Sequence, residues 1–155
     1  MRRYLIYGSL SGFISAIFEA IMFYLFDFLD SKPSGYQFTA IGIRLLHISG
    51  IYGETYGLLL HFLVGTVVAF FASIIAYYIG IFNIHNTKKG LLTGLLAGFL
   101  ILLVFSLPVN ILLLHLYIYE KYYLPSTFFY YLMHIFYGSV WGIFFGLFIS
   151  KLKIK

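Results

Sequence analysis

The sequence predicts an all-α membrane protein in which four transmembrane helices form one tightly packed bundle. Three observations carry this prediction: 62% of the 155 residues are hydrophobic, 10% are charged, and the mean hydropathy is +0.97. A soluble domain has about 25% charged residues and about half apolar residues. A chain with so few charges cannot cover itself with a water-facing surface, so a soluble catalytic domain is excluded.

Four apolar segments are long enough to cross a bilayer, which takes about 20 helical residues. They cover about residues 4–26, 56–82, 90–117 and 126–150, and the whole chain 1–155 is expected to form a single transmembrane domain. The first segment follows two arginines, as in a signal peptide, but its apolar run is much longer than the ~7–15 residues of a signal sequence. We therefore expect it to be retained as a helix.

The distribution of charge predicts the orientation in the membrane. Seven of the ten basic residues, and none of the five acidic residues, fall at one end of the predicted bundle: Arg2, Arg3, Lys88, Lys89, Lys151, Lys153 and Lys155. Basic residues are enriched on the cytoplasmic side of membrane proteins. Both termini are therefore expected in the cytoplasm, and the net charge of +5 is explained without nucleic acid.

The first outer loop, 27–55, is the longest connection. Within it, residues 39–52 are apolar but too few to cross a bilayer. A segment of this length is typical of an interfacial or re-entrant helix, with Arg44 and His47 near its polar side. A plain cap over the bundle is the alternative.

Each predicted span has a row of small residues at intervals of four, which places the row on one helix face. Small residues let helix backbones approach closely in lipid. We expect these rows to pack the bundle, although one or two could face another protein. The glycines concerned are Gly8, Gly12, Gly65, Gly90, Gly94, Gly98, Gly138, Gly142 and Gly146.

The second and fourth spans share the pattern Leu-x-His-x-x-x-Gly-(Thr/Ser)-Val, around His61 and His134. The first and third spans open with Gly8–Gly12 and Gly90–Gly94. This similarity predicts a 2+2 repeat whose halves have parallel orientation. Shared membrane composition explains part of it equally well.

Each span also carries one strongly polar residue at a similar depth, ~10–15 Å from the outer boundary by helical rise. These residues are Glu19, His61, Asn110 and His134. An ionisable residue inside a span is costly and is a functional hypothesis by default. Simple hydrogen bonding that locks the bundle is the alternative to a proton or ion path.

A third interpretation of the polar residues is a haem or metal site, for which His61, His134, His115 and His47 are the candidates. No histidine pair has the i, i+4 spacing of a metal-binding helix. The chain has no cysteine, which removes thiolate ligands and cysteine nucleophiles. Pro108 is expected to break the hydrogen-bond ladder of the third span about one turn before Asn110.

Taken in order, His61 with Gly65, the segment KGLLTGLLAGF leading to Pro108, and HIFYGSVWGIFFG resemble the small four-span prokaryotic membrane proteins of the YagU-like kind. The resemblance covers most of the chain and implies an integral cell-membrane protein of undefined biochemistry. Glu19 and the aromatic-rich outer loops depart from that pattern.

No nucleophile–base–acid set, P-loop or dinucleotide motif is present, so an enzyme is not expected. The sequence favours a non-catalytic accessory or structural subunit of a larger membrane complex, or a homo-oligomer, in a prokaryotic cell membrane. The alternatives are proton, ion or small-solute transport through an oligomer by Glu19, His61 and His134, and a haem- or metal-binding protein with an outer histidine site.

Overall fold

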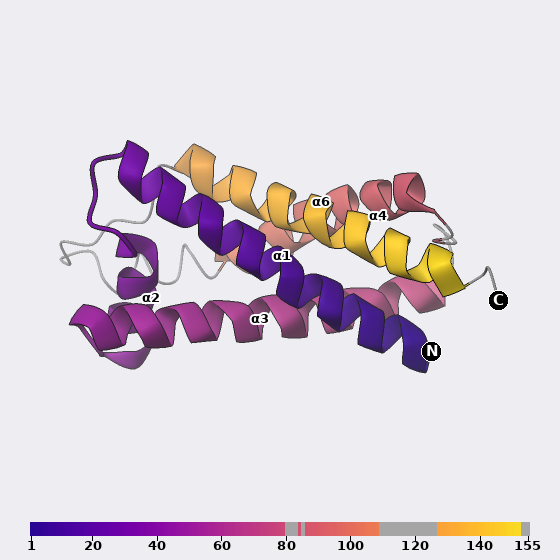
Figure 1. The fold of residues 1–155 in the computed structure, drawn as a ribbon, viewed down its shortest axis with the longest axis horizontal. Helices are drawn as coiled ribbons and strands as arrows, with labels where there is room; N and C mark the ends of the chain where they lie inside the picture. Colours follow the sequence, from indigo (N-terminus) through magenta and orange to yellow (C-terminus); the bar gives the residue numbers. More distant parts are fainter. Residues whose placement is uncertain (80–83, 85, 109–126, 153–155) are drawn as a thin grey trace.

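The computed structural model describes residues 1–79, 84, 86–108 and 127–152, and all regular structure in this part of the chain is helical (Figure 1). In chain order the elements are α1 (Arg2–Leu29), α2 (Tyr36–Leu46), α3 (Gly50–Ile79), α4 (Thr87–Ile101) with its π-helical continuation η1 (Leu102–Ser106), and α6 (Thr127–Leu152). No strand occurs in the described ranges, so the predicted all-α class is confirmed there.

Four of the helical segments are long and apolar enough to cross a membrane: Arg2–Leu29, Gly50–Ile79, Thr87–Val104 and Tyr131–Lys151. They correspond to the four spans expected from hydropathy. The last residues of the predicted second span, 80–82, and of the third, 109–117, lie outside the described residues. The chain is therefore a multi-pass membrane protein by the length and composition of its helices.

The four long helices are arranged as two pairs. α1 packs against α3, α4 packs against α6, and the two pairs meet where α1 contacts α6. In Figure 1 the beginning of α1 and the end of α6 lie at the same end of the molecule, and α2 lies at the opposite end. At the first of these ends the hydroxyl of Tyr78, near the end of α3, is 3.4 Å from the sulfur of Met1.

α2 is a separate helix of 11 residues that packs on the beginning of α3. It covers Tyr36–Leu46, whereas the sequence suggested a segment over 39–52, because the chain reverses at His47 (φ 57°) and α3 begins at Gly50. Gly42 and Gly57 permit the contact, since a Cβ on Gly42 would overlap the backbone of Gly53. The side chain of Arg44 is buried, whereas His47 is exposed.

The hydrogen-bond ladder of the third span changes over Leu102–Ser106, which form a π-helix directly before Leu107 and Pro108. Proline lacks an N–H, and its ring collides with the carbonyl four residues earlier in a regular α-helix. A π-helical turn is a known way to absorb such an irregularity. The irregularity therefore lies where Pro108 predicted it, and Asn110 lies outside the described residues.

Candidate functional site: a polar layer between α1, α3 and α6

The interface between α4 and α6 is made by two rows of glycines that face one another. A Cβ on Gly94 would overlap the carbonyl oxygen of Gly138, and one on Gly142 would overlap that of Gly90. Gly98 and Gly146 close the two ends of the rows in the same way, against His134 and Asn86 respectively. Backbone therefore lies on backbone along this interface.

The interface between α1 and α3 uses small side chains. A Cβ on Gly8 would overlap Ser73, and one on Gly12 would overlap the methyl of Ala69. A Cβ on Gly65 would be 2.9 Å from the methyl of Ala16. The small row of α1 thus lies on the small row of α3, and each row faces another helix of the same chain.

Glu19 and His61 meet across this interface. The Nε2 atom of His61 is 3.6 Å from Oε2 of Glu19 and 3.1 Å from the carbonyl oxygen of Ala16. Both side chains are largely buried, with relative exposures of 7% for Glu19 and 13% for His61. The sequence predicts a similar membrane depth for Glu19 and His61, and in the structure the two side chains are in contact.

Aromatic rings surround the imidazole of His61. The ring centroids of Phe38, Phe62 and Phe23 are 5.4, 5.9 and 6.1 Å from that of His61. Phe38 belongs to α2, is fully buried and packs in the same apolar cluster as Ala20 and Phe23. α2 therefore covers the Glu19–His61 contact with apolar surface on the side of the outer loop.

α6 adds Tyr137 and His134 to the layer. The hydroxyl of Tyr137 donates a hydrogen bond to the carbonyl of Gly65, one helical turn from His61, and lies within electrostatic range of Glu19. His134 interacts electrostatically with His61. We define the polar layer as Glu19, His61, His134 and Tyr137. Asn110, the fourth member of the polar cluster predicted from the sequence, lies outside the described residues.

Metal ligation finds little support in the described ranges. Within them no group of three or more His, Cys, Asp or Glu side chains is placed to hold a metal ion. Of the four histidines proposed as haem or metal ligands, His61 and His134 come near one another, His47 does not join them, and His115 lies outside the described residues.

Two functional contacts were missed by sequence reasoning, and both involve aromatic residues beside the glycine row of α6. Besides Tyr137, Trp141 is buried and donates a hydrogen bond from Nε1 to the carbonyl oxygen of Gly8, at 3.1 Å. The sequence pattern that indicates both contacts is YGSVWG, in which each aromatic residue directly precedes a glycine. A side chain next to such a glycine lies at the edge of a helix contact, within reach of the neighbouring backbone.

A second set of buried polar groups lies at the opposite end, between α1, α2 and α3. Asp27 is buried, and its carboxylate faces the backbone amides of Tyr36 and Gln37 at the beginning of α2, without a hydrogen bond of good geometry in the described structure. The hydroxyl of Tyr24 donates to Oε1 of Glu54 at 2.8 Å. A carboxylate at a helix N-terminus is favoured by the helix dipole, so these contacts account for the position of α2.

In the part of the chain that the structure describes, four membrane-length helices and the polar layer define a helical multi-pass membrane protein with a buried cluster of ionisable groups between α1, α3 and α6. No family model, curated protein or solved structure matches the chain. The resemblance to YagU-like proteins therefore remains a prediction from the sequence motifs.

Proposed function

We propose that this protein is a non-catalytic structural or accessory subunit of a membrane complex, or a homo-oligomer, in the cell membrane. The observation that carries the proposal is the enclosure of the Glu19–His61 contact. Aromatic rings of α1, α2 and α3 occupy its surroundings, and His61 also bonds the backbone of α1. A polar contact of this kind fixes the register of two helices and needs no substrate.

The large share of these 155 residues that lies in membrane-length helices supports the same proposal. Most of the residues belong to four membrane-length helices and their connections. On the positive-inside rule, the end that carries Arg2, Arg3, Lys88 and Lys89 is the cytoplasmic one. We therefore propose that the beginning of α1 and the end of α6 face the cytoplasm, in a prokaryotic cell.

Affinity purification tests this proposal. The full chain is isolated from native membranes in mild detergent, and the proteins that co-elute in stoichiometric amount are identified. Stoichiometric membrane subunits, or a defined homo-oligomer, are the expected result. Elution as a monomer with no stoichiometric partner would contradict the proposal.

Proton or ion transfer through an oligomer is the second candidate, favoured by one observation. Glu19 and His61 approach to 3.6 Å, and His134 of α6 lies within electrostatic range of His61. Three ionisable groups from three helices are the parts from which a proton relay is built.

Flux measurements in liposomes separate the two candidates. If the polar layer only locks the helices, the parent protein conducts no protons above empty liposomes. If it relays protons, the parent conducts and Glu19→Gln abolishes the flux without loss of folded protein. Asp30→Asn is the matched control, since Asp30 directly follows the same helix and pairs with Lys32 near the surface. A proton flux that survives Glu19→Gln would exclude this layer as the path.

A further inference from the structure

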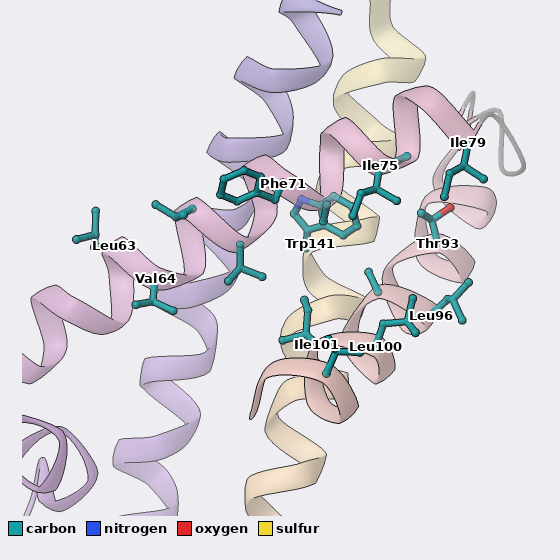
Figure 2. Close-up of a pocket in the computed structure, with 16 residues that line it drawn as sticks. Leu63, Val64, Phe71, Ile75, Ile79, Thr93, Leu96, Leu100, Ile101 and Trp141 are labelled. Carbon is teal, nitrogen blue, oxygen red and sulfur yellow. The ribbon is translucent and has the colours of Figure 1, made fainter. Parts of the chain in front are cut away.

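An apolar groove lies between α3 and α4, where the two helix pairs do not close on one another. Its volume is about 820 Å³. Figure 2 shows its walls, formed by one face of α3 with Phe71 and Ile75 and one face of α4 with Leu96 and Leu100, and Trp141 of α6 between them. The groove exists because α3 packs mainly on α1 and α2, and α4 mainly on α6.

The lining of this groove suits hydrocarbon and little else. Thr93 is the polar exception among the residues that line it. Its hydroxyl donates to the carbonyl of Lys89 at 2.8 Å. A polar ligand entering the groove would find no hydrogen-bond partner there, and burial of an unpaired polar group is unfavourable.

The groove is basic at one end. Lys89 precedes Thr93 by four residues and therefore lies on the same face of α4. Lys88 and Lys89 are both exposed. Side chains of a helix lean toward its N-terminus, and a lysine can extend its charge to the membrane surface. A molecule in this groove thus meets the positive charge of Lys89 at the end where Ile79 and Thr93 lie, whereas Lys88 lies on the face of Leu92, which does not line the groove.

A lipid matches these features better than a helix of another protein does. Helices associate in lipid through small residues, and the glycine rows of α4 and α6, like the small rows of α1 and α3, are already used within the chain. From Leu63 to Ile79 the groove extends ~24 Å along α3. This exceeds half of a hydrocarbon core of about 30 Å, so the acyl chain of one leaflet fits along it.

We propose that the α3–α4 groove binds an acyl chain of an anionic phospholipid whose phosphate lies at Lys89. Basic pockets between transmembrane helices are suited to anionic headgroups, and the cytoplasmic leaflet is rich in them. The inference goes beyond the proposed function and holds for a structural subunit and for a proton conductor alike, and it uses the proposed cytoplasmic orientation of this end.

Native mass spectrometry of the delipidated full chain tests the proposal. Phosphatidylglycerol and phosphatidylcholine with identical acyl chains are titrated into the detergent-solubilised protein. We expect one saturable phosphatidylglycerol site with about fivefold preference over phosphatidylcholine, since one lysine at the membrane surface contributes on the order of fivefold. Equal affinity for the two lipids would overturn the proposal.

Two pairs of variants locate the site. Lys89→Ala should lower phosphatidylglycerol affinity to that of phosphatidylcholine, whereas Lys151→Ala, at an exposed lysine on α6, should leave it unchanged. Leu100→Trp places an indole ring in the groove and should abolish the binding of both lipids. Leu92→Trp should not affect binding, because Leu92 is exposed on α4 and does not line the groove.

Each remaining outcome decides against the proposal. If Lys151→Ala weakens lipid binding as much as Lys89→Ala, the basic end of the molecule attracts anionic lipid without a defined site. If the parent carries no lipid but is a dimer that Leu100→Trp dissociates, the groove binds a second copy of the chain.

Discussion

The α4–α6 interface and the α1–α3 interface both use small residues at intervals of four, but they differ in what those residues touch. Between α4 and α6, glycine faces glycine and any Cβ would strike backbone. Between α1 and α3, glycine faces the side chains of Ser73 and Ala69, and a buried Glu19–His61 contact lies farther along. The same spacing in sequence thus produces two different kinds of contact.

This difference predicts how the α4–α6 and α1–α3 pairs respond to substitutions. Backbone cannot rotate away from an added methyl group, so the α4–α6 contact has no means of adjustment. A serine side chain can change its rotamer, and the α1–α3 contact also has polar groups that define one register of the two helices. We therefore expect α4–α6 to be sensitive to volume and α1–α3 to be sensitive to the loss of polar groups.

The largest effect is expected for Gly142→Leu in α6. Four additional carbon atoms would have to occupy the space of the Gly90 and Gly94 backbones, so helices α4 and α6 must separate. The variant should fail to elute as a monodisperse folded protein after detergent extraction. Leu132→Phe, an added bulk at an exposed position of the same helix, should elute like the parent. Normal elution of Gly142→Leu would refute the close packing of α4 and α6.

Replacing one glycine by alanine at each interface compares the two interfaces directly. Gly94→Ala and Gly65→Ala each gain about 1 kcal/mol of helix propensity, but overpacking costs about 1–3 kcal/mol. Gly94→Ala meets a backbone oxygen, whereas Gly65→Ala meets a methyl group and the edge of the Tyr137 ring. Unfolding titrations in mixed micelles should show that Gly94→Ala is the less stable variant. The reverse order would mean that α1–α3 is the tighter pair.

The polar contact of α1–α3 is expected to contribute less. A double-mutant cycle of Glu19→Gln and His61→Gln should give a coupling free energy of about 0.5–2 kcal/mol, as for polar contacts between membrane helices. The same cycle on Asp30 and Lys32, a partly exposed pair at 3.4 Å, should give less than about 0.5 kcal/mol. Equal couplings would show that burial adds nothing to the Glu19–His61 contact.

The smallest effect concerns the contact between the two pairs. Trp141→Phe removes the hydrogen bond to Gly8 and should lower the free energy of unfolding by about 0.5–1.5 kcal/mol. Tyr78→Phe is the control, since it removes only an exposed contact to Met1. If both variants are as stable as the parent, the indole nitrogen does not hold α6 on α1.

Much of the fold could be predicted from the sequence because one quantity, hydropathy, dominates it. The four spans follow from apolar runs, and the small rows follow from a spacing of four. The partners of the rows could not be predicted, since Gly8–Gly12 and Gly90–Gly94 offer nearly the same surface to any neighbour. Only the three-dimensional arrangement distinguishes α1 with α3 from α1 with α4.

The sequence predicts those members of the candidate site whose position depends only on their depth in the membrane. Counting residues from the outer boundary placed Glu19 and His61 at one level, and the structure brings them together. Tyr137 was not predicted, because a tyrosine in an apolar helix usually marks the membrane surface. Arg44 was expected near the polar side of its segment, but its side chain is buried in α2, because this helix packs on α3 and α1.

The contact of α1 with α6 has a mechanical consequence. Each glycine-packed or small-residue pair is held rigid, since its helices cannot slide without backbone overlap. The two pairs join through α6, whose Trp141 bonds the backbone of α1 at Gly8 and whose Tyr137 bonds the backbone of α3 at Gly65. Because one helix of the second pair is tied to both helices of the first, the two pairs are expected to tilt in the bilayer as one body.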